Sequence, residues 1–312
     1  MKLTRVQIVI ICGLALFVLV IGLIVSPPNL KTEDQTPLAG APSMPERSIQ
    51  ASKEPAKALI LSPERFEEKR HLKTDKKTKI QNSLNYLIHS PQKPWPKGIK
   101  FPVIIHLRDN NDTAFSAEYI TQDQMAYHFP AFSIVPDLRN QFRGALSKDY
   151  NNLPDLKFAH ERYQEERDTV DYKKLREDSA LVTKPILALL DDLESELPID
   201  KSQIYLIGCG YGGATAFSLI EARPQKFASA VIINSAWDTQ TQNKLTKTPI
   251  LMLNGKKNGV FSSFIAQSLS NQINKSGGKT IFQAYDSMPH TCSYKSLYSN
   301  KMWKWMFAQS RQ

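Results

Sequence analysis

Three kinds of side chain in the C-terminal half of the chain could together carry out nucleophilic hydrolysis. Cys209 lies within IYLIGCGYGGATAF, residues 204–217, and an ionised cysteine is a strong nucleophile. His290, in the segment YDSMPHTC, could act as a general base. Asp238, in NSAWD, could orient and stabilise that imidazole. Such a set of groups would suit an ester or a thioester as substrate.

The elements that must position these groups follow a regular order. Short apolar runs bounded by turn residues alternate with helical patterns, which predicts a doubly wound, mostly parallel sheet with helices on both faces. Pro185 should kink or restart the longest of the helices. The strands are expected at residues 101–107, 131–136, 198–208, 229–234, 249–255 and 280–285, and the helices at 168–197, 212–222, 262–275 and 295–309.

In this setting the chain resembles the α/β-hydrolase superfamily over about residues 98–308. It is most similar to the branch that holds bacterial carboxylesterases, feruloyl esterases, polyhydroxybutyrate depolymerases and predicted peptidases. In that family a strand ends in G-x-S-x-G-G and opens a helix, and residues 208–213 here read GCGYGG. The segments PIDKSQIYLIG before this turn and RPQKFASAVIINSA after it also resemble the family's flanks. The resemblance implies an α/β-hydrolase fold with its active site at the glycine-rich turn.

The residue at the apex of this turn departs from the family pattern. The apex is held in a strained conformation that projects the nucleophile over the sheet, and its neighbours two positions away must be small. Gly208 and Gly212 meet that need, but the apex is Gly210, which has no hydroxyl. Glycine adopts positive φ without a steric penalty. We therefore expect the turn to be preserved while the nucleophile is absent.

Two of the remaining catalytic positions are also altered. The acid position, in the turn GKKNG, is Asn258, which cannot carry a negative charge; Asp238 could replace it from the preceding strand. Arg108 and Asp109 stand where the oxyanion segment of the family begins with H-G, and a carboxylate there would oppose a developing negative charge. His290 matches the family histidine, either as a retained packing residue or as part of a ligand site.

Cys209 has three interpretations. A cysteine at the apex of such a turn would need small neighbours, whereas Ile207 and Tyr211 stand there. We therefore expect its side chain to point away from the apex and to pack around the strand as a buried structural cysteine. The alternatives are a relocated nucleophile and a disulfide with Cys292, because the family geometry brings the turn and the histidine loop together.

Two functional hypotheses follow. The leading one is a catalytically degenerate hydrolase-like protein that acts as a binding or scaffold component of the cell envelope. Its candidate cleft is formed by Arg108, Asp109, Tyr211 and His290. The alternative is an active esterase or thioesterase with a relocated nucleophile, paired with His290 and Asp238. The candidates for that nucleophile are Cys209, Ser235 and Ser287.

The N-terminal part predicts a membrane anchor. Residues 6–25 carry no charge and are long enough to cross a bilayer as a helix. Basic residues occur before this span, which should keep residues 1–5 in the cytoplasm and place the body in the periplasm, on the far side of the inner membrane. A removed signal peptide is the alternative. Residues 26–97 are rich in proline and basic side chains and predict a partly disordered tether, with a short helix near residues 62–84.

The composition of the chain limits the classes of binding partner and cofactor that we expect. The formal charge of +10 includes a basic cluster between residues 69 and 79, which could lie against anionic lipid or wall polymer or remain a solvated face. No nucleic-acid motif accompanies the cluster, so we expect no nucleic-acid partner. The six histidines lack ligand spacing and no phosphate-binding loop occurs, so we expect no metal and no cofactor. The hydrolase-like domain is expected at residues 98–312, and its partner to be an envelope protein, a wall polymer or a lipid.

Overall fold

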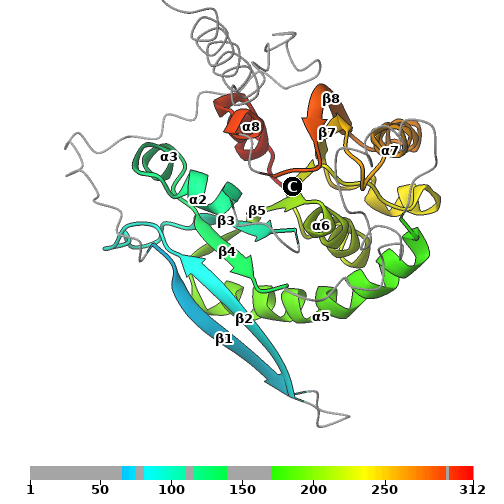
Figure 1. The fold of residues 1–312 in the computed structure, drawn as a ribbon. Helices are drawn as coiled ribbons and strands as arrows, with labels where there is room; N and C mark the ends of the chain where they lie inside the picture. The colour runs from blue at the N-terminus through cyan, green and yellow to red at the C-terminus, as the bar shows by residue number, and fades with distance from the viewer. Residues whose placement is uncertain (1–64, 75–80, 110–114, 139–169, 293–294, 312) are drawn as a thin grey trace, which may run out of the picture. The chain divides into compact units, whose positions relative to one another are not determined.

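The computed structural model describes residues 65–74, 81–109, 115–138, 170–292 and 295–311 (Figure 1). The predicted anchor at residues 6–25 lies outside these ranges. Among the described residues, no helix combines the length and the apolar character that crossing a bilayer requires.

The described strands form one eight-stranded sheet in the order β1-β2-β4-β3-β5-β6-β7-β8. The pairings that join β4, β3, β5, β6, β7 and β8 are parallel, whereas β1 pairs with β2 and β2 pairs with β4 in antiparallel fashion. The mostly parallel α/β sheet predicted from the sequence is confirmed. The strands are β1 (Glu67–Thr74), β2 (Gln81–His89), β3 (Phe101–Leu107), β4 (Phe132–Pro136), β5 (Ile199–Cys209), β6 (Ser229–Ile233), β7 (Ile250–Lys257) and β8 (Thr280–Pro289).

The helices after residue 170 follow in the predicted order, whereas α2 (Phe115–Ile120) and α3 (Asp123–His128), between β3 and β4, were not expected. Helix α5 continues through Pro185, so the expected restart does not occur. The residues on its inner face, among them Ile186 and Leu190, are buried against the core and hold the helix together where one backbone bond is lost. The helices are α2 (Phe115–Ile120), α3 (Asp123–His128), α5 (Tyr172–Glu196), α6 (Tyr211–Ala222), α7 (Ser263–Lys275) and α8 (Asn300–Phe307), with 3-10 turns η2 (Thr239–Leu245) and η3 (Lys295–Tyr298).

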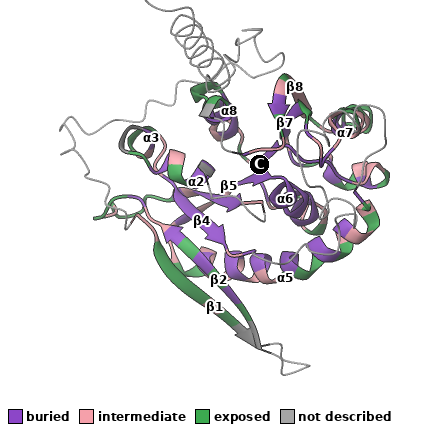
Figure 2. Ribbon diagram, in the orientation of Figure 1, coloured by how far each residue is buried: buried purple, intermediate pink, exposed green. Residues whose placement is uncertain are grey.

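Alternate residues of the central strands face two different helical layers. Leu206 of β5 belongs to the core cluster that includes Phe217 of α6 and buried residues of α5. Its neighbour Tyr205 points to the other face, where its hydroxyl donates to the carbonyl oxygen of Gln309 at 2.8 Å, just beyond α8. Because both faces of these strands are covered, the central strands are buried along most of their length (Figure 2).

The β1–β2 hairpin corrects the predicted tether. Residues 26–97 were expected to be a partly disordered linker with a short helix near 62–84, yet strands occupy Glu67–Thr74 and Gln81–His89. In β2, buried Leu84, Tyr86 and Ile88 alternate with exposed residues, which is the period of a strand with one buried face. The charged residues of β1 lie on the exposed outer edge, which explains why the segment resembles a linker in composition (Figure 2). The folded body therefore includes residues well before the predicted boundary at 98.

Candidate functional site

The glycine-rich turn between β5 and α6 has the predicted geometry. Gly210 has φ 52° and ψ −120°, a backbone conformation that residues other than glycine rarely adopt. Its N–H donates to the carbonyl oxygen of Ile233 at 3.0 Å. A Cβ atom added to Gly212 would lie 2.0 Å from the carbonyl oxygen of Leu107, so the close approach of β3 to the start of α6 requires glycine there. The residue at the apex of the turn is therefore Gly210, as the sequence indicates.

The space beside the apex is filled by Asp109, which follows β3. A Cβ atom added to Gly210 would lie 2.4 Å from Oδ2 of Asp109 and 2.5 Å from its Cγ. A larger residue at 210 could be accommodated only if this carboxylate moved. The place where a nucleophilic side chain would begin is thus held by a carboxylate from another segment.

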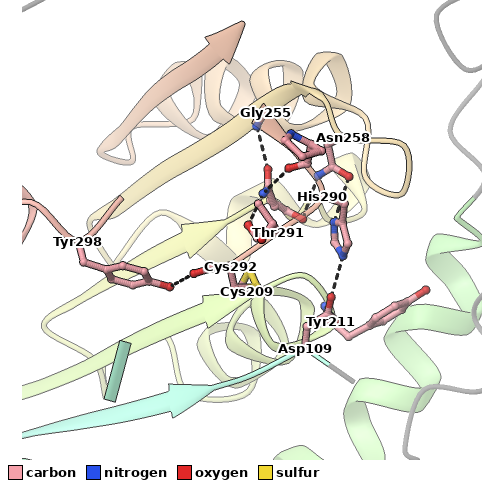
Figure 3. Close-up of a disulfide and its surroundings, with 11 residues drawn as sticks. Asp109, Cys209, Tyr211, Gly255, Asn258, His290, Thr291, Cys292 and Tyr298 are labelled. Atoms are coloured by element: carbon pink, nitrogen blue, oxygen red, sulfur yellow. Dashed lines mark hydrogen bonds and ion pairs between the residues drawn. A yellow bond between two sulfur atoms is a disulfide. The ribbon is translucent and has the colours of Figure 1, made fainter. Parts of the chain in front are cut away.

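Both oxygens of this carboxylate accept hydrogen bonds at the mouth of the turn (Figure 3). Oδ2 lies 2.7 Å from Nε2 of His290, and Oδ1 accepts from the backbone N–H of Tyr211 at 3.1 Å. The side chains of Asp109 and His290 are only 14% and 17% exposed, so water screens the pair weakly. One carboxylate is therefore hydrogen-bonded to two groups at once, the imidazole of His290 and the backbone N–H of Tyr211, the first residue of helix α6.

The other nitrogen of His290 is held by Asn258. Nδ1 of His290 lies 3.1 Å from Oδ1 of Asn258, and that oxygen also accepts from the N–H groups of Val260 and Phe261, each at 3.0 Å. The two backbone donors fix the amide with its oxygen toward the ring, so Nδ1 must carry a proton and donate. When Nε2 carries a proton as well, it donates to Oδ2 of Asp109, and the pair is an imidazolium with a carboxylate.

Asn234, which the sequence analysis did not single out, fixes the loop that carries His290. It is fully buried, has φ 49°, and its Nδ2 donates to the carbonyl oxygens of Pro289 and Thr291 at 3.1 and 2.6 Å. Its Oδ1 accepts from the N–H of Gly255 at 2.8 Å. The amide thus holds the backbone on both sides of His290. The available signal was a polar residue directly after the buried strand β6, at the edge where the ends of parallel strands meet.

Cys209 and Cys292 form a disulfide, with their Cα atoms 6.0 Å apart. This corrects two expectations: the side chain of Cys209 does not point away into the packing around the strand, and its sulfur is not available as a nucleophile. The reason is the path of the chain after β8. Asn234, at the end of β6, hydrogen-bonds to the backbone of this loop, and the loop continues to the end of β5, where Cys292 meets Cys209. The hydroxyl of Tyr298 donates to the carbonyl oxygen of Cys292 at 2.8 Å and fixes the same loop (Figure 3).

The remaining candidate residues do not join this constellation. Asp238 caps η2 and pairs with Arg176 of α5, its Oδ2 accepting from Nη1 at 3.2 Å, so Asn258 and not Asp238 partners the histidine. Ser235 is fully buried and packs where a Cβ on Gly213 would stand, inside the first turn of α6. Nε2 of His290 is engaged by Asp109, and no hydrogen bond joins Ser287 to that ring among the described contacts.

Arg108 is next to Asp109 in the sequence, but its side chain forms a hydrogen bond with a residue that follows β4. Its Nη2 donates to Oδ1 of Asp137, directly after β4, at 3.1 Å. Of the candidate cleft, the structure therefore brings together Asp109, Tyr211 and His290 and directs the guanidinium elsewhere. Within the described part of the chain, no group of three or more potential ligand side chains is arranged to hold a metal ion.

A second histidine is buried within the core. His106 of β3 is 1% exposed, and its Nδ1 lies 2.8 Å from Oγ of Ser116. Burial, together with the smaller effect of the charge of His89, lowers its pKa from 6.5 to about 3. This ring is therefore neutral at physiological pH and belongs to the structural core, where it makes the fold sensitive to acid.

Comparisons with known proteins agree with the observed fold. The family described as Phospholipase/Carboxylesterase matches residues 166–303. A thermostable esterase has 19% identity and a TM-score of 0.58 and covers 79% of this chain, which spans 64% of that protein. A ferulic acid esterase from Anaeromyces mucronatus has 12% identity and a TM-score of 0.49, over 78% of this chain and 90% of its own. At 19% identity the thermostable esterase shows the fold alone. No curated protein matches the sequence.

Proposed function

We propose that the chain is a catalytically silent member of the α/β-hydrolase superfamily that acts by binding rather than by turnover. The observation that supports this most strongly is the carboxylate of Asp109, which fills the space beside Gly210 where a hydrolase would present its nucleophile. Asp109 also engages both the imidazole of His290 and the N–H of Tyr211.

The chemistry of acyl transfer explains why this arrangement is unproductive. A nucleophilic hydrolase needs an oxygen or sulfur at the apex, a free basic nitrogen to accept its proton, and an unoccupied donor for the developing oxyanion. Gly210 supplies no such atom. Nε2 of His290 and the N–H of Tyr211 are already taken by Asp109, whose negative charge would repel an oxyanion. All three requirements are therefore unmet in the same small volume.

A second candidate function is ester hydrolysis by Asp109 itself, because its carboxylate is the group in contact with His290. Attack by Oδ2 on the acyl carbon of an ester would break the bond to the alkoxide, which would leave as the alcohol with a proton from His290, and would form an anhydride with Asp109. Water deprotonated by His290 would then have to cleave this anhydride, which would release the acid and regenerate the carboxylate of Asp109. The engagement of both carboxylate oxygens argues against this route, since attack would require the bond to Tyr211 or to His290 to break first.

The proposed place of action is the cell envelope. We propose that residues 6–25 anchor the chain in the inner membrane and that the hydrolase-like body faces the periplasm. The Cys209–Cys292 disulfide supports an oxidising compartment for this body. Its partner would then be an envelope protein, a wall polymer or a lipid.

The test of the silent site uses the full-length protein in detergent. A fluorophosphonate probe should not label it, and short-chain p-nitrophenyl esters should be hydrolysed no faster than with the His290→Ala variant. Labelling or turnover that is lost in His290→Ala would overturn the proposal. Turnover lost in Asp109→Asn as well, but without probe labelling, would instead support the second candidate.

A further inference from the structure

The two donors that face each other across the turn are spaced for one carboxylate. Nε2 of His290 meets Oδ2 of Asp109 at 2.7 Å, and the N–H of Tyr211 meets Oδ1 at 3.1 Å. At least one donor reaches each oxygen, so the pair recognises the planar two-oxygen group rather than a single charge.

The surroundings favour an anion at this point. The N–H of Tyr211 opens α6, a helix of twelve residues, and the first turn of a helix carries unsatisfied donors and a partial positive charge. His290 adds a second donor from a different segment, held in place by Asn258 and, through its backbone, by Asn234. Low exposure of the pair strengthens both hydrogen bonds relative to those in water.

We propose that His290 and the backbone N–H of Tyr211 form a binding site for a small monocarboxylate, and that Asp109 occupies this site as an internal ligand. The proposal rests on the silent hydrolase site proposed above. It adds the chemical class of the ligand. The altered site would bind a carboxylate, which is the product of ester hydrolysis, and not the ester itself.

The covalent attachment of Asp109 to the chain explains why a carboxylate in solution would not bind at this site in the wild-type protein. Asp109 is attached to the end of β3, so its carboxylate is present at an effective concentration far above that of any dissolved acid. The site is therefore latent while Asp109 is in place. Removing that one side chain should expose it without altering either donor.

The test removes the internal ligand and supplies it again in solution. Asp109→Gly deletes a group that corresponds to acetate, so acetate should bind to this variant of the full-length protein and raise its unfolding midpoint in a saturable way. Sodium chloride at equal ionic strength and acetamide, the neutral isostere, should not have this effect. The wild-type protein should not respond to acetate.

Two further variants assign the effect to the site. Asp109→Gly combined with His290→Gln retains the space but loses the imidazole, and its acetate affinity should fall by about tenfold or more, as expected when a charge-assisted hydrogen bond is lost. Asp109→Asn keeps the side chain in place, so acetate should not stabilise it. Equal acetate binding by Asp109→Gly with and without His290 would overturn the proposed site.

The design allows for a variant that fails to fold. Asp109→Ala deletes a group that corresponds to formate, so formate should stabilise this variant as acetate stabilises Asp109→Gly. If neither variant gains stability from its matching carboxylate, or if both remain unfolded in its presence, the proposal is wrong. Ester turnover by the wild-type protein would contradict the silent site instead, so the two failures can be told apart.

Discussion

The carboxylate of Asp109 lies 2.7 Å from Nε2 of His290, although the two residues are 181 positions apart in the chain. The same carboxylate is within 2.4 Å of the point where a side chain on Gly210 would begin. The loss of the nucleophile and the entry of Asp109 are thus two aspects of one arrangement, because the absence of a side chain at 210 makes the space that Asp109 fills. This relationship leads to the first prediction.

Restoring a nucleophile should require two substitutions. Gly210→Ser alone should be less stable than the wild type by about 1–3 kcal/mol, since it forces a serine into a positive-φ conformation and against Asp109. Asp109→Gly together with Gly210→Ser clears that space and should place a hydroxyl near His290. We expect the double variant to react with a fluorophosphonate probe at least about 100-fold faster than Asp109→Gly, which is a typical contribution of a positioned base.

The control for this reconstitution is the same pair of substitutions combined with His290→Ala, which should remove the labelling. A double variant that is folded, as judged by its far-ultraviolet circular dichroism, yet remains unlabelled would show that the turn no longer presents residue 210 to the histidine.

The disulfide should contribute strongly to stability. It joins Cys209 and Cys292 across a separation of 83 residues, and the chain-entropy model gives about 4.5 kcal/mol for a loop of that length. Replacing both cysteines by alanine should lower the free energy of unfolding by a large part of this amount, as measured by guanidinium denaturation at equilibrium. Reduction of the wild-type protein should give a similar loss. A loss below about 1 kcal/mol in both experiments would contradict the prediction.

Asn234 should be needed for two separable reasons. Asn234→Gly keeps the freedom to adopt positive φ but removes the bonds to the backbone around His290, so we expect a loss of about 2–4 kcal/mol from buried groups left without partners. Asn234→Ala should lose a further amount of about 1 kcal/mol, because alanine is strained at φ 49°. Equal unfolding free energies for the two variants would indicate that the backbone conformation contributes nothing.

The buried ring of His106 should make the protein less stable in mild acid. Burial lowers its pKa to about 3, against an ordinary value of 6.5, so below 6.5 the unfolded chain binds a proton that the folded protein does not. Its contribution is fully present above pH 6.5 and is lost as the pH falls toward 3, by up to about 1.4 kcal/mol per pH unit.

The matched control is His106→Asn, which can keep a hydrogen bond to Ser116 but does not titrate in this range. The fall in unfolding free energy between about pH 7 and about pH 5 should be smaller in this variant than in the wild type. Equal slopes in the two proteins would show that His106 takes up its proton in the folded state as readily as in the unfolded chain.

The sequence predicted the site in part. Motif spacing singled out Gly210, His290 and Asp109, and the structure places Asp109 against both of the other two residues. The choice between Asn258 and Asp238 stayed open until the structure placed Nδ1 of His290 against the amide oxygen. Both residues follow strands at the same edge of the sheet, and only the paths of the two loops determine which of them reaches the ring.

The sequence by itself determined the order of the strands from β3 onward, the helices from α5 onward and the glycine-rich turn. Hydrophobic periodicity and the need for glycine at a crowded bend are local properties of the chain. Tertiary structure alone decided that Asp109 fills the space beside Gly210 and that Cys209 pairs with Cys292. It also decided that the charged segment before residue 98 forms an edge hairpin. Each of these depends on a contact between segments whose separation in space is set by how the whole sheet packs.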